Sequence, residues 1–315
     1  MTVQELIDNG AEFVLALSYG KDSLRSLAAI KKLGWPLHRI VHREIWATDT
    51  IPADLPPMVE FKAVADKWIL DNFGITVEHV CATERQVSAG GVRLTYEKQF
   101  YKVRRSGKIY GFPIVRGNWC TSQLKTDIRK DVLSQVGRDI QKAWRDSGIS
   151  NDERSLLHKA ENLKFSQSTL AQGAKKNIVQ YLGIAADEPK RIERHQKRDN
   201  ILLPLVEIGW TEDDCWKWCK ENGLLSPIYT TAARGGCWFC HNQSVDQLRL
   251  LRKNYPEYWQ LLLKWDEDSP VSFKPDGRTV HDFDRRFELE DEGYIKPGEI
   301  FRWGILENPY IQLEF

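Results

Sequence analysis

The sequence predicts an α/β fold: a doubly wound, mostly parallel sheet, followed by a helical and irregular C-terminal region. Short apolar runs alternate with amphipathic stretches between residues 13 and 80, which is the pattern of strands joined by crossover helices. Strand-like runs return within residues 177–206. Beyond Trp210 the pattern predicts only short helices and turns.

The individual elements follow from the spacing of apolar residues. Residues 13–17 (FVLAL) form a continuous apolar run, as a buried parallel strand does. The segment 22–33 places its apolar residues near one helical face and stops at Gly34 and Pro36, which end helices. The other expected elements are strands at 38–46, 75–80, 177–184 and 201–206, and a helix from Pro56 to Phe73.

Length and composition describe an ordinary globular chain. Its 315 residues are 42% hydrophobic and 28% charged, which excludes wholesale disorder. No apolar run reaches the roughly 18 residues of a membrane helix, and the N-terminus lacks a secretory apolar stretch, so we expect a cytoplasmic protein without a membrane partner. The net charge of +1 gives no overall electrostatic indication of nucleic-acid binding. The six cysteines are expected to be thiols, available to metals.

The sharpest local motif is the loop 18–23, whose residues are Ser18, Tyr19, Gly20, Lys21, Asp22 and Ser23. It joins the first strand to the first helix, and a helix N-terminus presents unpaired amides and partial positive charge. Gly20 permits a tight turn, while the serine hydroxyls and the Lys21 ammonium add donors and charge that suit a pyrophosphate. The spacing is not that of a Walker A motif. The alternative is an ordinary turn in which Asp22 or Ser23 caps the helix.

Four blocks of sequence carry a family resemblance. Residues 14–24 (VLALSYGKDSL) resemble the SGGxDS loop of the PP-loop ATP pyrophosphatase (adenine nucleotide alpha-hydrolase) superfamily, with Tyr19 in place of the first loop glycine. The blocks 110–125 (YGFPIVRGNWCTSQLK), 181–194 (YLGIAADEPKRIER) and 204–240 resemble the phosphoadenylylsulfate (PAPS) reductase-like family of that superfamily. The resemblance covers about residues 10–242.

The resemblance implies a HUP-like PP-loop domain over residues 1–206, with a basic, aromatic insertion at about 84–118 and a helical one at about 123–175. A C-terminal region, 207–315, would carry a C-x-x-C metal knuckle. The resemblance also implies that ATP or another adenylyl nucleotide binds with its phosphates at the 18–23 loop, together with Mg²⁺, and that ATP is split between its α and β phosphates. The implied residues are Trp46 to Asp49 around the adenine, Asp22 and Asp49 for Mg²⁺, and Lys21, Asp22 and Cys120 in catalysis.

The cysteines suggest a metal site. Cys237 and Cys240 form a C-x-x-C after two glycines, a turn that can aim two thiolates at one ion, although a redox motif or coincidence fits the same spacing. In the similar cluster-bearing reductases, the cysteine that matches Cys120 joins this motif. Those proteins have a cysteine pair where this chain has Trp119 and Cys120, so the resemblance implies a 4Fe–4S cluster held by three cysteines. Zinc with His241, or metal-free thiols, are the alternatives. Cys215 and Cys219 are spaced i, i+4 on one face of an expected helix, where the pair could supply a ligand. These two cysteines and Cys81 are interpreted instead as small buried hydrophobes.

Two basic segments are candidates for nucleic-acid contact. The first interleaves Lys98, Lys102, Arg104, Arg105 and Lys108 with Tyr96, Phe100, Tyr101 and Tyr110. Such a mixture can neutralise phosphates and stack bases, but it is also typical of a solvated, hairpin-like excursion. The second segment is 190–198 (KRIERHQKR).

The expected function is ATP-dependent adenylyl transfer, in a sulfurtransferase that acts on nucleic acid and takes sulfur from a cysteine desulfurase. A sulfonucleotide (PAPS or APS) reductase is an alternative, but the family's reductases use a cysteine near the C-terminus, and none follows Cys240. A non-catalytic nucleotide-binding module of a larger complex is the other alternative. The complete 18–23 loop argues against such a module.

Overall fold

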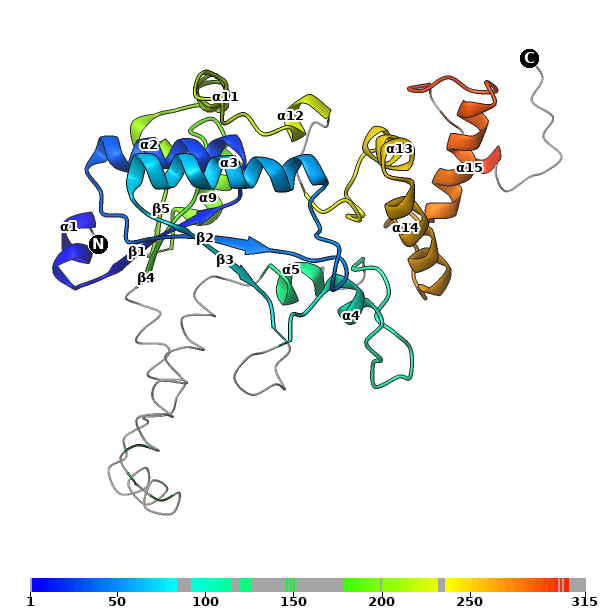
Figure 1. Ribbon diagram of the computed structural model, residues 1–315, viewed down its shortest axis with the longest axis horizontal. Coiled ribbons are helices and arrows are strands. Elements are labelled where there is room, and N and C mark those ends of the chain that lie inside the picture. Colours follow the sequence, from blue (N-terminus) through cyan, green and yellow to red (C-terminus); the bar gives the residue numbers. More distant parts are fainter. Residues whose placement is uncertain are drawn as a thin grey trace. The chain divides into compact units, whose positions relative to one another are not determined.

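The computed structural model describes residues 2–83, 92–114, 119–125, 178–198, 200–231, 236–299, 301 and 303–305, together with Asp146, Gly148 and Ser150 (Figure 1). Most of the helical insertion expected at 123–175 therefore lies outside the described residues. No helix in the described ranges combines the length and the apolarity needed to cross a membrane. The chain divides into two compact units.

The helices and strands, in chain order, are α1 (Val3–Asp8), β1 (Glu12–Leu17), α2 (Lys21–Leu33), β2 (Arg39–Glu44), α3 (Pro56–Phe73), β3 (Val77–Cys81), α4 (Tyr96–Phe100), α5 (Trp119–Gln123), β4 (Ile178–Tyr181), α9 (Pro189–His195), β5 (Ile201–Leu202), α10 (Pro204–Ile208), α11 (Glu212–Glu221), α12 (Ile228–Thr231), α13 (Val245–Asn254), α14 (Pro256–Asp268), α15 (Val280–Asp291) and the 3₁₀ helix η1 (Trp303–Ile305).

The first unit, residues 1–43, 57–80 and 126–227, contains a five-stranded parallel sheet in the order β3-β2-β1-β4-β5. The central strand β1 pairs Val14 with Arg39 of β2 and Glu12 with Ile178 of β4. Helices α2 and α3 lie over one face of the sheet (Figure 1). The predicted α/β class is therefore confirmed. Because β1 is followed by β2 on one side and flanked by β4 on the other, the strand order reverses between β1 and β4.

Most predicted boundaries lie within two residues of the observed ones. Gly34 adopts a left-handed conformation (φ 66°) and ends α2, as its position predicts. The strand expected at 201–206 is too long: β5 contains only Ile201 and Leu202, because Pro204 opens α10. Proline is favoured at the first position of a helix, where its missing N–H costs nothing.

The second unit, residues 44–56, 81–125 and 228–315, is built around an aromatic core. This division differs from the one expected at residue 206, because the segments 44–56 and 81–125 bury side chains with the C-terminal helices. Trp259 and Trp265 of α14 and Phe283 and Phe287 of α15 are at most 2% exposed. The many tryptophans of the chain thus serve in part as core residues of this unit.

Candidate functional site

The 18–23 loop follows β1 directly. Gly20 is the N-cap residue of α2 and offers no side chain to the first amides of the helix, so neither Asp22 nor Ser23 is the cap. Ser18 Oγ donates to Ser23 Oγ (3.0 Å), and Ser23 Oγ donates to the Gly20 carbonyl oxygen (2.9 Å). We expected these two hydroxyls to face a phosphate. Instead they bond to each other and to the backbone of the loop, and so stabilise its turn.

Tyr19 adopts a left-handed backbone conformation (φ 57°), which glycine accepts far more readily than tyrosine. Its side chain is fully buried and its hydroxyl donates to Asp66 Oδ1 of α3. The same hydroxyl lies 3.1 Å from His79 Nε2 of β3, which in turn is 2.8 Å from Asp66 Oδ2. These contacts fix the loop at Tyr19. Asp66 and His79 carried no signal in the sequence.

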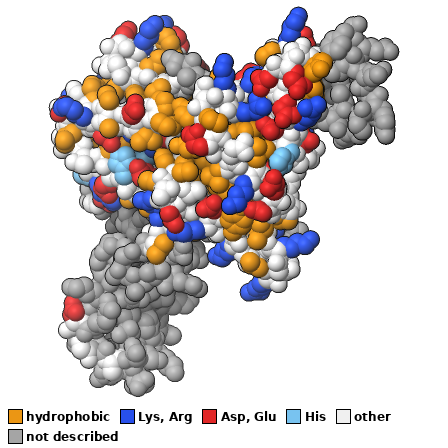
Figure 2. All heavy atoms as spheres, turned by 45° about the vertical axis from the view of Figure 1, so that its right-hand side comes forward, with side chains coloured by type: hydrophobic (Ala, Val, Ile, Leu, Met, Phe, Trp, Pro, Cys, Tyr) orange, Lys and Arg blue, Asp and Glu red, His pale blue; other side chains and the backbone are white. Residues whose placement is uncertain are grey.

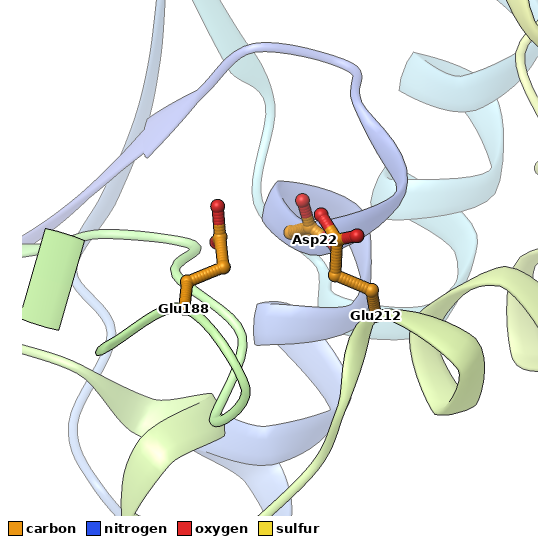
Figure 3. Close-up of side chains that lie close together, drawn as sticks. All are labelled: Asp22, Glu188 and Glu212. Atoms are coloured by element: carbon orange, nitrogen blue, oxygen red, sulfur yellow. The ribbon is translucent and has the colours of Figure 1, made fainter. Parts of the chain in front are cut away.

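Three carboxylates meet beside the loop: Asp22, Glu188 and Glu212 (Figure 3). One oxygen from each lies within 4.8 Å of the others, and no other group of three Cys, His, Asp or Glu ligand atoms in the described residues is this close. Asp22 is in the first turn of α2, Glu188 precedes α9 and Glu212 begins α11. The Glu212 amide donates to Asp187 Oδ1 (3.0 Å), which ties the start of α11 to the segment before α9.

Cations balance only part of this acidic group. Lys21 Nζ lies 2.8 Å from Asp22 Oδ1 and 3.2 Å from Glu212 Oε1, and Arg191 Nη1 lies 2.5 Å from Glu188 Oε1. Burial raises the pKa of Asp22; Lys21 opposes this, while Glu212 and Glu188 add to it. Burial also works against the charge of Lys21, but Asp22 and Glu212 outweigh it and raise the pKa of this lysine. A divalent cation would relieve the repulsion among the carboxylates, and Mg²⁺ takes such oxygen ligands.

The acidic group lies in the region where α/β sheets usually bind ligands. The segments that follow β1 and β4 leave the carboxyl end of the sheet where the strand order reverses, and ligand crevices form at such points. Gly183, two residues beyond β4, packs its backbone against Asp22 and Ser23. In the sequence, the block containing Gly183 and Glu188 carries a family resemblance and no local sign of this contact. Its contact with the 18–23 loop depends on the pairing of β4 with β1.

Trp46 and Asp49, the residues expected around the adenine, belong to the second unit. Asp49 Oδ1 accepts a hydrogen bond from Lys98 Nζ (2.7 Å). The guanidinium carbon of Arg93 lies 3.7 Å from the ring centre of Trp46. The carboxylates that accompany Asp22 are therefore Glu188 and Glu212, whereas Asp49 has a lysine partner in its own unit.

The three candidate metal-binding cysteines share one neighbourhood in the second unit. Cys120 is the second residue of α5, and a turn closed by the Cys240 amide and the Cys237 carbonyl oxygen (3.0 Å) presents the C-x-x-C. Burial raises the pKa of Cys237 to about 12; Lys125 opposes the shift, and Cys240, Asp54 and Cys120 add to it. Burial and the charge of Cys240 also raise the pKa of Cys120. The thiols thus act on one another, although their three sulfurs do not all lie within 4.8 Å.

Aromatic residues anchor the chain on both sides of these cysteines. Trp238 and Phe239, between Cys237 and Cys240, are 2% and 3% exposed, and Trp238 Nε1 donates to the Pro52 carbonyl oxygen (2.9 Å). Trp119 is also buried, and its Nε1 donates to the Gly111 carbonyl oxygen (3.1 Å). Trp119 is therefore a core residue.

The remaining candidate ligands differ in their surroundings. His241 is buried, and its Nδ1 has no hydrogen-bond partner among the described residues, but it forms no group within 4.8 Å with the cysteines. Cys215 and Cys219 are fully buried on α11 of the first unit, and Cys219 Sγ donates to the Lys21 carbonyl oxygen (3.5 Å). These two cysteines are small buried side chains, as interpreted. Cys81, at the end of β3, is partly exposed rather than buried.

The basic segment 96–110 includes a hairpin. Val103 pairs with Ile109 in an antiparallel bridge. Tyr96 and Phe100 are at most 1% exposed, so the proposed stacking of nucleic-acid bases on these two rings is wrong. The exposed cations of the hairpin are Lys102, Arg105 and Lys108. Figure 2 shows acidic and basic side chains interspersed on the face that it displays.

The candidate site thus has two parts, each described within its own unit: the loop with its acidic group, and the three cysteines. Comparisons with protein-family models, curated proteins and solved structures found no match to the chain. The functional assignment therefore depends on the chemistry of these two groups and on the motifs in the sequence.

Proposed function

We propose that this chain is an ATP-dependent adenylyl-transferring enzyme of the PAPS reductase-like family of the PP-loop superfamily. The observation that carries the proposal is the 18–23 loop, which opens α2 at the carboxyl end of the central strand, beside the acidic group Asp22, Glu188 and Glu212. Amides at a helix N-terminus can bind phosphate, and ligands of open α/β sheets commonly bind where the strand order reverses, which supports the proposal.

In this proposal the acceptor attacks the α-phosphorus of ATP. The bond from the α-phosphorus to the oxygen that bridges it to the β-phosphorus breaks, and pyrophosphate leaves with the bonding electrons. The amides of the first turn of α2 and the Lys21 ammonium bind the phosphates and stabilise the charge that develops on pyrophosphate. Asp22, Glu188 and Glu212 would hold Mg²⁺, which supplies positive charge to the phosphates.

We further propose that Cys120, Cys237 and Cys240 hold a 4Fe–4S cluster, which would supply an iron site for sulfur during its transfer. Three thiols on buried, anchored segments are a donor set that suits such a cluster. The three sulfurs do not all lie within 4.8 Å of one another. Zinc–sulfur bonds of about 2.3 Å would place thiolates on one zinc within about 4 Å of one another, so this spacing favours a cluster over a single zinc ion. The sulfur donor would be a cysteine desulfurase.

The acceptor in this proposal is a nucleic acid. The exposed cations of the 103–109 hairpin and of α9, which include Lys190 and Arg194, can each neutralise a phosphate. Such binding weakens steeply as the salt concentration rises, since each neutralised phosphate releases a counterion. Charge reversal at Lys102, Arg105 and Lys108 is expected to lower both the affinity and its salt dependence. Unchanged affinity for nucleic acid in that variant would show that the hairpin is not part of the acceptor site.

The test of the reaction is the identity of the product released from ATP, with and without tRNA or DNA. Adenylyl transfer releases pyrophosphate, and the nucleic acid that stimulates this release identifies the acceptor class. Lys67→Ala, an exposed change on α3, serves as the control. Release of orthophosphate alone would contradict adenylyl transfer, and ATP binding without turnover would favour the non-catalytic module. Metal analysis after anaerobic purification separates iron from zinc.

A further inference from the structure

The Tyr96 hydroxyl is a buried polar group whose partner is missing from the described residues. Tyr96 is 1% exposed, and its Oη has no hydrogen-bond partner in the described part of the chain. The position of the residue is fixed, since its amide donates to the Trp46 carbonyl oxygen (2.8 Å) and the preceding Thr95 caps α4. Buried hydroxyls normally have a partner, because an unsatisfied one loses its hydration without compensation.

The ring of Tyr96 lies between the two segments that carry the candidate metal-binding cysteines. Its centre is 5.0 Å from that of Trp119, the residue before Cys120, and 4.2 Å from that of Phe239, within the C-x-x-C. Burial raises the pKa of Tyr96 well above its usual value, and the charges of Cys120, Cys240 and Cys237 contribute to this shift. The hydroxyl therefore stays protonated.

We infer that the Tyr96 hydroxyl donates a hydrogen bond to a sulfur of the group held by Cys120, Cys237 and Cys240, and that it is a positioning residue that raises the reduction potential of that group. This inference rests on the proposed cluster. A bound cluster would place sulfide and thiolate sulfurs in the space between the three cysteines. A donor stabilises the reduced cluster more than the oxidised one, since the reduced cluster carries more negative charge, and hydrogen bonds to sulfur are known to set cluster potentials.

Tyr96→Phe tests the inference, because it removes the oxygen and keeps the ring that packs on Trp119 and Phe239. Tyr101→Phe is the matched control: Tyr101 follows α4 directly, and its hydroxyl donates to Asp268 Oδ2 (2.6 Å). The protein is purified anaerobically, and its iron and sulfide contents, visible spectrum and reduction potential are measured. We expect Tyr96→Phe to keep its iron and sulfide and to be reduced at a lower potential than the parent, whereas Tyr101→Phe keeps the parental potential.

Thermal unfolding with and without the cluster adds a readout that does not depend on activity. Removing an unpartnered hydroxyl is expected to leave the cluster-free protein as stable as its parent or more so. Cluster binding should then stabilise Tyr96→Phe less than it stabilises the parent. Deuterium ENDOR of the reduced parent supplies a measurement that needs no variant, and the absence of a coupled exchangeable deuteron would overturn the inference.

The outcomes separate this inference from the function on which it rests. A parent protein without iron would overturn both the cluster and the role of Tyr96. A parent with a cluster, beside a Tyr96→Phe protein with the same iron content and the same potential, would overturn the role of Tyr96 alone. A lower potential in both Tyr96→Phe and Tyr101→Phe would also overturn it, because the effect would then be a general one of the segment.

Discussion

The backbones of Gly183 and Ser23 approach each other so closely that no room is left for a side chain at residue 183. A Cβ atom added to Gly183 would lie 2.6 Å from the Ser23 nitrogen and 2.7 Å from the Asp22 carbonyl carbon. Both of these atoms belong to the backbone of the first turn of α2, so no flexible group can move aside. The segment after β4 thus fixes the position of the 18–23 loop.

Gly183→Ala is therefore expected to displace the first turn of α2. We predict that it lowers the free energy of unfolding by about 1–3 kcal/mol, as overpacking does, and weakens ATP binding. Thermal unfolding and calorimetric titration measure the two effects. Gly304→Ala, where an added Cβ would meet nothing within 4 Å, is the control. An alanine at residue 183 that bound ATP with parental affinity would contradict the role of this contact.

Tyr19→Phe removes a hydroxyl that contacts both Asp66 and His79. The partners Asp66 and His79 are partly exposed, so we expect the loss of this hydrogen bond to cost about 0.5–1.5 kcal/mol of stability. We also expect weaker ATP binding, because the hydroxyl no longer holds the loop to α3. Tyr181→Phe, which removes a hydrogen bond to the Pro36 carbonyl oxygen (2.7 Å) in the same unit, should lower stability and spare ATP affinity. Equal ATP affinities in the two variants would contradict the role of the Tyr19 hydroxyl in holding the loop.

The double change Lys21→Ala and Ser23→Ala removes an ammonium and a hydroxyl from the loop. It is expected to weaken ATP binding at least about 10-fold, which corresponds to about 1.4 kcal/mol. Calorimetric titration provides the measurement and Lys67→Ala the control. Full ATP affinity in the double variant would exclude the 18–23 loop as the phosphate site.

Serine substitutions should divide the cysteines into two classes. Cys120→Ser, Cys237→Ser and Cys240→Ser are each expected to lose most of the bound iron, because oxygen replaces a thiolate ligand. Cys215→Ser and Cys219→Ser should keep the iron but cost about 1–3 kcal/mol of stability, since each buries a hydroxyl in an apolar site. Iron and sulfide analysis with thermal unfolding distinguishes the classes. Iron loss from Cys215→Ser alone would contradict the assignment of Cys120, Cys237 and Cys240 as the iron ligands.

The pair Arg39 and Glu78, on the neighbouring strands β2 and β3, predicts a dependence of stability on pH. Arg39 Nε lies 2.6 Å from Glu78 Oε1, and this hydrogen bond lowers the pKa of Glu78 against the effect of burial. A carboxyl with a lowered pKa stabilises the fold at neutral pH, and this contribution is lost as the pH falls through its folded pKa, below the usual value of 4.5. Because the pair is partly exposed, the effect is on the order of 0.5 kcal/mol.

Glu78→Gln should therefore reduce stability at pH 7 and have little effect near pH 2, where Glu78 is protonated in the parent. Denaturant unfolding at a series of pH values measures the difference. Glu60→Gln, an exposed change on α3, should follow the parent at every pH. A constant difference between Glu78→Gln and the parent across this range would rule out the ion pair as its source.

The basic, aromatic segment shows where local reasoning fails. Tyr96 and Phe100 stand among charged residues in the sequence, and nothing local distinguishes a buried ring from an exposed one there. Their burial depends on Trp265, whose ring centre lies 5.1 Å from that of Tyr96 and 6.0 Å from that of Phe100. Contacts over such a sequence separation arise from the packing of the whole unit and leave no periodic signal.

The sequence by itself determined the elements from β1 to β3 and the 18–23 loop. Strand β1, helix α2 and the stop at Gly34 follow from side-chain periodicity and from the conformations of single residues, which act over a few positions. Only the tertiary structure decided which side chains meet. Glu188 and Glu212 join Asp22 because β4 pairs with β1 and because the start of α11 is tied to Asp187. Those long-range contacts are chosen by the packing of the sheet and its helices, which no local pattern encodes.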